Sequence, residues 1–378
     1  MKKYDVAVVG GGIIGATIAL ELARDKLRVV VLDRRQPGRG ASWAAAGMLS
    51  PAPDSPRDTS LVPLLRRSLQ LYPDFVAVIG EESGRPTGYA RNGALQIFRG
   101  PNGEADRNAE VAEHRHLGLT AEPIALETAR EWEPPIGPSA AAAAWLPDEG
   151  TIEPRLLMDA VLSVVRSHRV EICSDCEVTG LVRLNGRCAG VMARGEHITA
   201  GSVVLAAGCY SGQILEASGF AAAYAPTRPV RGQMLCLRSN DVRLRRVVRS
   251  HRAYLVPRAD GRIVAGSTLE EAGFKKQVTP AGIKHILEGV LELCPALGNA
   301  EVLETWSGLR PGTSDDLPII GPTEMDGLLI ATGHYRNGIL LAPVTARLIR
   351  NFLTRSHTDF DSQAFSPLRF VRQAQAAT

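Results

Sequence analysis

Three glycines near the start of the chain have a spacing that can hold phosphate groups. Gly10, Gly12 and Gly15 fit the pattern GxGxxG within the stretch YDVAVVGGGIIGATIAL. The first glycine of such a pattern permits a tight turn, the second lets the backbone approach a pyrophosphate, and the third lets a helix pack close to a strand. The N-terminus of that helix offers N–H groups and the positive end of its dipole to the phosphates.

The elements around these glycines complete the pattern of a dinucleotide site. Residues 4–9 form an apolar, β-branched run, 13–25 carry apolar residues at helical spacing, and 28–32 form a second such run. Asp33 follows, where a carboxylate can accept hydrogen bonds from a ribose. A Gly-rich turn that binds nothing is the alternative, but strand, helix, strand and acid in register favour a dinucleotide.

Two further segments bear on whether that dinucleotide is FAD or NAD, since the acid suits the adenosine ribose of either. The small residues from Gly40 to Met48 permit a second close approach of the backbone. Residues 333–338 form another strand-to-helix turn far along the chain. An extended cofactor needs contacts at both places, and the dipole of the following helix can stabilise negative charge on a reduced flavin. The pattern therefore favours FAD.

The composition is that of an ordinary globular protein. Of 378 residues 45% are hydrophobic and 22% charged, with 43 Lys and Arg against 40 Asp and Glu. A net charge of +3 argues against a dedicated nucleic-acid binder. No apolar run reaches the roughly 18–20 residues that span a bilayer. The short run after the first lysines indicates a strand and not a signal peptide, so we expect a cytoplasmic location.

The six cysteines predict no metal site. Without a secretory signal we expect free thiols. Cys173 and Cys176 form a CxxC, but no second CxxC or nearby His completes four zinc ligands. We therefore interpret this pair as structural.

The order of the predicted elements indicates an α/β fold. Asn185-Gly186 and Asp260-Gly261 predict hairpin turns between strands. Residues 328–350 predict a strand, a turn and a helix. Pro343 would break a helix interior, so we expect that helix to begin near Ala342.

This order also predicts two interleaved domains. One is a Rossmann-like FAD-binding domain with a parallel sheet and a βαβ start, and the other a mixed, mainly antiparallel substrate-binding domain. We assign residues 1–88, 150–225 and 305–378 to the first and residues 89–149 and 226–304 to the second.

Several stretches along the chain carry a resemblance to known enzymes. They are VVGGGIIGATIA, GASWAAAGML, LPDEGTIEPRLL, VVLAAGCYSG, WSGLRPGTSDDLPIIG and GHYRNGILLAPVTA. The chain resembles the D-amino-acid oxidase superfamily of FAD enzymes and, within it, the glycine oxidases of thiamine biosynthesis. The resemblance implies non-covalent FAD and oxidative deamination of glycine, sarcosine or a small D-amino acid.

Together with the glycine motif, the resemblance predicts the residues that contact FAD. They are Gly10, Gly12, Ile13, Ile14, Gly15, Asp33, Arg34, Ala41, Ser42, Ala46, Gly47, Met48, Val178, Gly208, His334, Tyr335, Arg336, Asn337, Gly338, Ile339 and Leu340. His334 is expected to serve FAD through its backbone and not as a general base, because the resemblance suggests that hydride transfer depends mainly on positioning.

The resemblance also implies which residues handle the substrate. Arg310 and Arg336 would face it, and Tyr254 would cover it. A guanidinium such as Arg310 pairs with a carboxylate through two parallel hydrogen bonds. From local sequence alone, the alternative is a surface arginine.

The sequence departs from the glycine oxidase pattern at two places. Arg252 stands where the pattern has a His before Tyr254, with His251 one step away, and a Met that lines the family's pocket aligns near Leu269. These departures bear on which small amine is the substrate.

Three functions are compatible with these residues. The first is a glycine oxidase-like enzyme that uses O2, forms hydrogen peroxide and supplies the glycine imine for thiazole synthesis. The second is a dehydrogenase of the same fold that acts on a D-amino acid or an N-methyl amino acid with another acceptor. The third is a flavin-binding scaffold without catalysis, against which Arg310 and Arg336 argue. A homo-oligomer is compatible with each.

Overall fold

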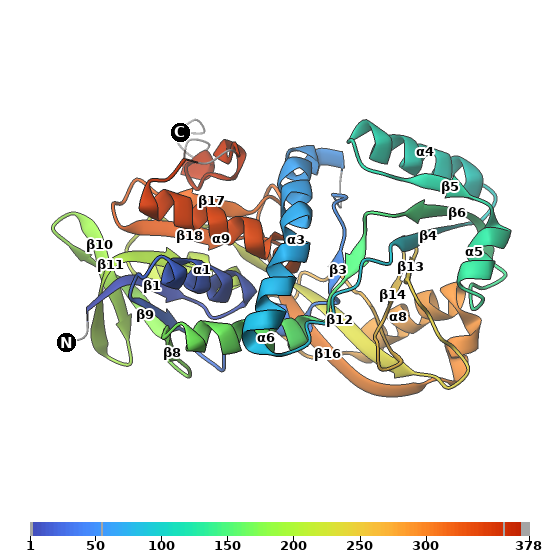
Figure 1. Cartoon of the computed structure of the whole chain (residues 1–378), viewed down its shortest axis with the longest axis horizontal. Coiled ribbons are helices and arrows are strands. Elements are labelled where there is room, and N and C mark those ends of the chain that lie inside the picture. The colour runs from blue at the N-terminus through green and yellow to red at the C-terminus, as the bar shows by residue number, and fades with distance from the viewer. Residues whose placement is uncertain (1–2, 54–55, 358–359, 372–378) are drawn as a thin grey trace.

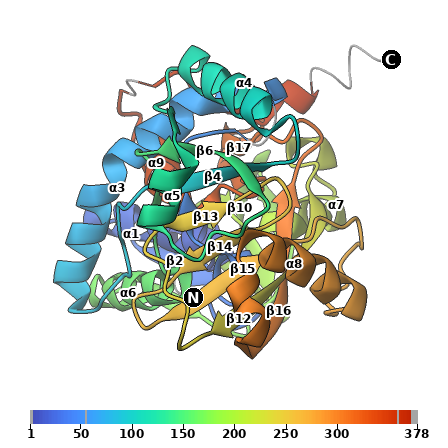
Figure 2. The same ribbon diagram turned by 90° about the vertical axis from the view of Figure 1, so that its right-hand side faces the viewer.

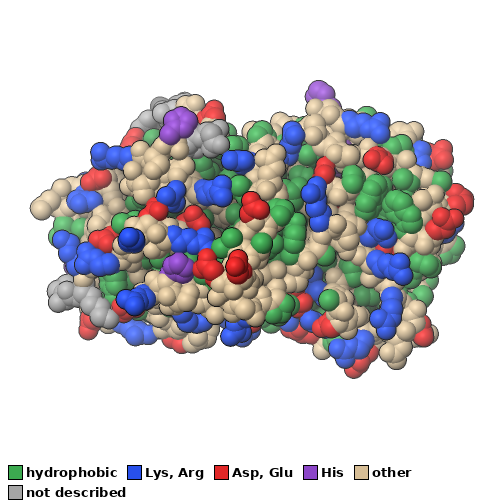
Figure 3. Space-filling model, viewed as in Figure 1, with side chains coloured by type: hydrophobic (Ala, Val, Ile, Leu, Met, Phe, Trp, Pro, Cys, Tyr) green, Lys and Arg blue, Asp and Glu red, His purple; other side chains and the backbone are tan. Residues whose placement is uncertain are grey.

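The computed structural model describes residues 3–53, 56–357 and 360–371, arranged as two lobes that each contain an eight-stranded sheet (Figure 1). Within these ranges, no helix has the length and apolar character needed to cross a membrane. On the face shown in Figure 3, side chains of both charges are interspersed among the described residues, in keeping with the balanced composition.

The first sheet is mainly parallel. Its strands are β1 (Lys3–Val9), β2 (Val29–Leu32), β8 (Glu171–Cys173), β9 (Val178–Leu184), β10 (Arg187–Ala193), β11 (Glu196–Leu205), β17 (Ile319–Pro322) and β18 (Leu328–Thr332). They follow the order β17-β18-β11-β1-β2-β8, with the antiparallel β9–β10 hairpin attached to β11. Val6 and Val8 of β1 belong to the core on one face and Ala7 and Val9 to the core on the other. Both faces are therefore covered, as the continuous apolar run of β1 predicts.

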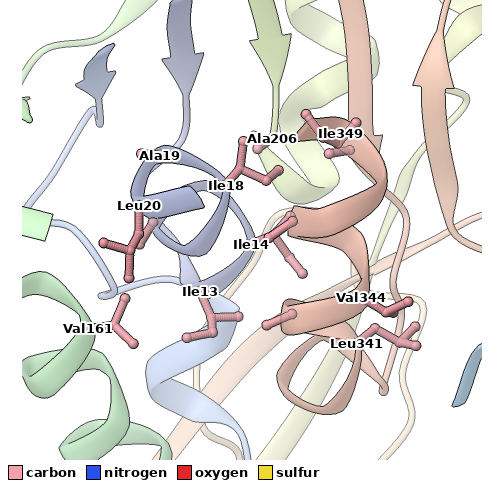
Figure 4. Packing of buried hydrophobic residues seen from close by; sticks show 14 of the residues in the cluster. Ile13, Ile14, Ile18, Ala19, Leu20, Val161, Ala206, Leu341, Val344 and Ile349 are labelled. Atoms are coloured by element: carbon pink, nitrogen blue, oxygen red, sulfur yellow. The ribbon is translucent and has the colours of Figure 1, made fainter. Parts of the chain in front are cut away.

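Four helices pack together on one face of this sheet. They are α1 (Ile13–Arg24), α3 (Val62–Ser83), α6 (Pro154–Ser167) and α9 (Gly338–Thr354). Figure 4 shows Ile14 and Ile18 on the side of α1 that faces α9, with Ile18 near Ile349 of α9. In Figure 1, α3 runs between the two lobes. α1 packs on both α9 and α6, and the glycine turn lies at the N-terminal end of α1.

The second sheet is mainly antiparallel. Its strands are β4 (Ala94–Arg99), β5 (Glu122–Ile124), β6 (Ala140–Leu146), β12 (Arg228–Arg238), β13 (Val247–Arg249), β14 (Tyr254–Pro257), β15 (Arg262–Gly266) and β16 (Glu301–Gly312). They follow the order β16-β12-β15-β14-β13-β4-β6-β5. Among the described residues, β13–β4 is the one parallel pair of this sheet. The lobe also contains α4 (Gly103–His116), α5 (Leu126–Trp132) and α8 (Pro280–Leu293), and Figure 2 views it end-on.

The two faces of the second sheet have different partners. Leu235 and Leu237 of β12 pack in the core that includes α5 and α8. Met234 and Cys236 alternate with them and lie in another core together with Ala44. This period of two sends one side of β12 toward the first lobe. Four short elements complete the connections: α2 (Ala41–Ala44), α7 (Ser211–Ala217) and the paired β3 (Met48–Leu49) and β7 (Gly150–Thr151).

The predicted α/β fold is confirmed, with its βαβ start and mixed second sheet. Both predicted hairpins are present, as β9–β10 and β14–β15. β16 belongs to the second sheet, because it pairs with β12 along its length. The predicted domain limit between residues 304 and 305 therefore falls inside this strand. We propose the same interleaved division, with the last crossing at the end of β16.

The predicted start of the last helix near Ala342 is wrong, because α9 begins at Gly338 and contains Pro343. Pro343 has no N–H, so it leaves the Ile339 carbonyl without its usual intrahelical donor. The Tyr72 hydroxyl of α3 donates to that carbonyl at 3.2 Å. A neighbouring helix thus compensates for the proline, which the local sequence cannot reveal.

Candidate active site

A cavity of about 610 Å³ lies between the two sheets and is lined by both. This volume is in the range of small-molecule sites. On the first-sheet side the lining includes Val9, Leu32, Ala206 and Thr332, at or directly after the carboxyl ends of β1, β2, β11 and β18. Ligands of open α/β sheets bind at this edge, so the cavity has the expected place in the fold.

Close backbone packing at the turn requires glycine at two of its positions. Gly10 has φ +105°, and a Cβ there would lie 2.4 Å from the Ala206 carbonyl oxygen. A Cβ on Gly15 would lie 1.9 Å from the Gly10 carbonyl oxygen. Gly12 lines the cavity between them. Side chains at Gly10 and Gly15 would therefore clash with main-chain carbonyl groups. With glycine there, the backbone of the turn lines the cavity directly.

Two helices begin at this cavity. Neither α1 nor α9 has an acidic residue in its first turn or a side-chain cap from its own N-cap residue, Gly12 or Asn337. Ser42 Oγ accepts a hydrogen bond from the Ile13 N–H at 2.9 Å and thereby ties α2 to α1. Two helix N-termini without an acidic residue in the first turn make this wall attractive to negative charge.

Asp33 lies in the lining at the end of β2. Its Oδ2 accepts from the Gly11 N–H at 2.8 Å and its Oδ1 from the Arg35 N–H at 2.9 Å. Burial raises the pKa of Asp33, and these two hydrogen bonds oppose that shift. Each oxygen keeps a further lone pair for a hydroxyl group.

An aromatic stack lies beside Asp33, and its members Arg34 and Tyr210 line the cavity whereas Phe274 does not. The Arg34 guanidinium lies 3.6 Å from the centre of the Tyr210 ring, and the Tyr210 and Phe274 rings stack with centres 4.8 Å apart. Lys276 lines the cavity from the same loop as Phe274. Burial and the nearby charges of Arg35 and Arg34 lower the pKa of Lys276. The sequence predicts no role for Tyr210, although this residue lies in the stretch VVLAAGCYSG. It also predicts none for Phe274 and Lys276, because no motif links their loop to the glycine turn.

Arg310 projects from β16 into the second-sheet wall of the cavity. Its Nη2 donates to Ser267 Oγ at 2.8 Å, and its Nη1 donates to the carbonyl oxygens of Thr268 at 3.1 Å and Arg231 at 3.4 Å. Gly232 makes room for the guanidinium, because a Cβ there would lie 2.3 Å from Nη2. The guanidinium is therefore fixed in orientation by main-chain and hydroxyl oxygens.

Tyr254 lines the same wall from β14. Its hydroxyl donates to Met234 Sδ at 3.1 Å. Met234 lines the cavity, whereas Leu269 is 60% exposed and lies outside the lining. Arg252 forms ion pairs with Glu288 and Glu292 away from the cavity.

The turn before α9 forms the third part of the lining. The Tyr335 N–H donates to the Pro311 carbonyl at 3.0 Å, which joins this turn to β16. Arg336 is exposed and lines the cavity. His334 is buried, with Nε2 3.0 Å from Thr345 Oγ1, and burial lowers its pKa to about 3. A ring with this pKa is a weak proton acceptor near neutral pH.

A buried arginine of the second lobe supports the cofactor side. Arg258 donates to the carbonyl oxygens of Ala46 at 2.6 Å and Ile152 at 3.2 Å. Burial lowers the pKa of Arg258 to about 10. The segment around Ala46 is thus held in place from the opposite sheet.

The structure brings most of the predicted residues to this one cavity. The predicted residues in its lining are Gly10, Gly12, Ile13, Ile14, Asp33, Arg34, Ala41, Ser42, Ala46, Gly47, Met48, Val178, Gly208, Tyr254, Arg310, His334, Tyr335, Arg336, Gly338 and Ile339. Gly15, Asn337 and Leu340 lie outside the lining. Cys176 also lines the cavity. No group of three metal-binding side chains occurs in the described part of the chain.

These features fit FAD. The glycine turn and the two helix N-termini suit a pyrophosphate and a flavin that gains negative charge, and Asp33 suits a ribose. A cavity that reaches from Asp33 to Arg310 suits an elongated cofactor with space for a small acid beside it.

Comparisons with known proteins agree with a site for FAD. The family model described as FAD dependent oxidoreductase matches residues 5–351. The glycine oxidase of Pseudomonas putida is 32% identical over 364 residues, which cover 96% of this chain and 98% of that protein. The crystal structure of glycine oxidase from Geobacillus kaustophilus superposes with a TM-score of 0.91 at 31% identity, covering 98% of this chain and 99% of that one.

A third relative is longer than this chain. The bifunctional protein ThiO/ThiG of Trichormus variabilis is 34% identical over 374 residues, which cover 98% of this chain and 56% of that protein. The chain thus spans about half the length of this relative. From the family match and these similarities, the chain belongs to the family of FAD-dependent oxidoreductases and is similar to its glycine oxidases.

Proposed function

We propose that the chain catalyses the FAD-dependent oxidative deamination of glycine or a similar small amine, such as sarcosine or a small D-amino acid. The observation that carries this proposal is the position of Arg310. Its guanidinium lies in the same cavity as the glycine turn, on the opposite wall. One site thus combines a cradle for a flavin nucleotide with a group that pairs with carboxylates.

The residues of the first sheet would hold FAD non-covalently. Backbone groups at Gly12 and the first turn of α1 would bind the pyrophosphate, and Asp33 would bind the adenosine ribose. The turn at 334–339 would lie beside the flavin, where the N-terminus of α9 stabilises negative charge. Bound FAD supplies a hydride acceptor for the amine carbon, and its reoxidation by O2 gives hydrogen peroxide.

The residues of the second sheet would hold the substrate. Arg310 would pair with the carboxylate and so fix the distance and direction of the amine carbon. Tyr254 would cover this carbon, with its hydroxyl kept in place by Met234. Arg336 would contribute positive charge at the rim.

No proton needs to be held by His334 in this scheme. Its low pKa makes it a poor base near neutral pH. We infer that the substrate reacts as the free amine after its ammonium proton has passed to solvent. The imine product then hydrolyses in water, and we also propose that it supplies thiazole synthesis, as the resemblance implies.

The experiment compares substrates and acceptors with the FAD-loaded protein. Glycine, sarcosine, D-alanine and D-proline are supplied in air, and hydrogen peroxide and the carbonyl product are measured. We expect turnover with at least one of them. Peroxide that never forms while an artificial acceptor is reduced would show a dehydrogenase instead. A flavin that stays oxidised with all four amines would overturn the proposal.

A further inference from the structure

The segment that orients Arg310 leaves the second sheet directly after β15. Ser267 supplies one acceptor for the guanidinium and the Thr268 carbonyl supplies another. The third acceptor, the Arg231 carbonyl, belongs to β12 on the other side. The direction of the guanidinium therefore depends on how this segment is held against β12.

The Glu270 carboxylate lies at the centre of the contacts between them. Its Oε1 accepts from Gln233 Nε2 at 2.7 Å and from the Thr268 hydroxyl, and its Oε2 pairs with the Arg231 guanidinium. The main chains of Glu270 and Arg231 also exchange hydrogen bonds of 2.9 and 3.0 Å. Glu270 thus contacts both residues whose carbonyl groups hold Arg310.

Gln233 makes this arrangement rigid. Its side chain is fully buried, and its backbone N–H donates to Thr268 Oγ1 at 2.9 Å. Its Oε1 accepts from the Thr279 N–H at 2.8 Å, which ties the network to the N-cap of α8. Every hydrogen bond in this network constrains the others, so loss of one partner leaves buried polar groups unsatisfied.

The carboxylate is held in its ionised form. Burial opposes this, but the hydrogen bonds from Arg231, Thr268 and Gln233 together lower the pKa of Glu270. An ionised acceptor makes stronger hydrogen bonds than a neutral one. The charge of Glu270, and not only its shape, therefore fixes the Thr268 segment.

We propose that Glu270 is a positioning residue for substrate binding, which holds the Thr268 and Arg231 carbonyl groups so that the Arg310 guanidinium faces the substrate carboxylate. This inference rests on the proposed function, because Arg310 must be the carboxylate anchor. Glu270 itself lies outside the lining of the cavity.

The test uses Glu270→Gln, which removes the charge and keeps the shape, and Thr268→Val, which removes the hydroxyl and keeps the carbonyl. We expect each to raise KM for the amino acid roughly 3- to 10-fold, with kcat within about twofold. The inhibition constant of acetate, a carboxylate without an amine, rises by the same factor. The matched control is Glu271→Gln, since the neighbouring Glu271 side chain is 62% exposed and pairs with Arg228.

The readouts separate positioning from a general structural role. Positioning leaves kcat and the FAD dissociation constant near wild type, even though the thermal unfolding midpoint falls where buried polar groups lose a partner. A general structural role changes kcat and the FAD dissociation constant together with KM and overturns the inference. Arg310→Ala is measured in parallel. If Arg310→Ala raises KM but Glu270→Gln and Thr268→Val do not, this inference is wrong and the proposed function stands. If Arg310→Ala leaves KM unchanged, the proposed carboxylate anchor is wrong.

Discussion

The two walls of the cavity are built in opposite ways. The wall on the side of the first sheet, where we propose that FAD binds and which we call the cofactor wall, depends mainly on backbone: the glycine turn and the N-termini of α1 and α9, together with the acid Asp33. The wall on the side of the second sheet, where we propose that the substrate binds and which we call the substrate wall, depends on side chains, and Arg310 is held by residues 79 and 42 positions away in the sequence. A site made of local backbone is visible in the sequence, whereas a site made of distant side chains depends on strand pairing.

Removal of Arg310 should have the largest effect, because we propose that this guanidinium is the anchor of the substrate carboxylate. We expect Arg310→Ala to raise KM for the amino acid roughly 30- to 160-fold, from a loss of about 2–3 kcal/mol. Steady-state peroxide formation measures this change. Arg228→Ala, an exposed arginine on the neighbouring strand, should leave KM near wild type. Equal changes in both variants would show that general charge, and not the anchor, matters.

The backbone wall is tested by adding one methyl group. Gly15→Ala places a Cβ 1.9 Å from the Gly10 carbonyl oxygen, so we expect a loss of about 1–3 kcal/mol in the free energy of unfolding. Gly80→Ala in α3 is the control, since its nearest neighbour would lie 3.8 Å away and alanine favours helix by about 0.5–1 kcal/mol. Denaturant unfolding of FAD-free protein measures both. The same sign for both variants would argue against tight packing at the turn.

His334 gives the cofactor wall a pH dependence that can be measured, because its buried ring is neutral at neutral pH. Its folded-state pKa of about 3 lies below the ordinary 6.5, so the unfolded chain binds the proton more readily. Its contribution to stability is therefore complete above about pH 6.5 and is lost as the pH falls toward about 3. Between pH 6.5 and 5 we expect a loss of about 1–2 kcal/mol that is absent in His334→Gln. Identical pH dependence of unfolding in both proteins would refute this.

The aromatic stack should have the smallest effect, since Phe274 only covers Tyr210 and is 40% exposed. A stacked pair contributes about 0.5–1.5 kcal/mol, so Phe274→Ala should raise the FAD dissociation constant roughly 2- to 10-fold. Flavin fluorescence on release measures it. Leu184→Ala, a 49% exposed residue of β9, is the control. An unchanged constant in Phe274→Ala would mean that this loop does not close over the cofactor.

The glycine turn and its acid could be predicted from the sequence because they are neighbours along the chain. Gly10, Gly15 and Asp33 follow the spacing of a dinucleotide-binding βαβ unit, and the structure places them at one turn. The α/β fold followed from buried runs and hairpin signals for the same reason.

The remaining features depend on contacts between distant segments. Glu270, Lys276 and Phe274 lie in a loop without a local pattern, and only the pairing of β12 with β15 and β16 brings that loop to the cavity. The start of α9 was mispredicted because Tyr72, which compensates for Pro343, is far away in the sequence. The carboxylate-binding role of Arg310 came from the resemblance to a known family. The local sequence around Arg310 was also compatible with a surface arginine.

The most direct test of the account compares an amino acid with the amine that lacks its carboxylate. FAD-loaded protein is mixed without oxygen with glycine or methylamine, and with sarcosine or dimethylamine, while flavin absorbance is recorded. We predict that at least one acid reduces the flavin at a concentration at least about 30-fold below its matched amine, and that Arg310→Ala removes most of this difference. Equal concentration dependence for acid and amine in the wild-type protein would contradict the account.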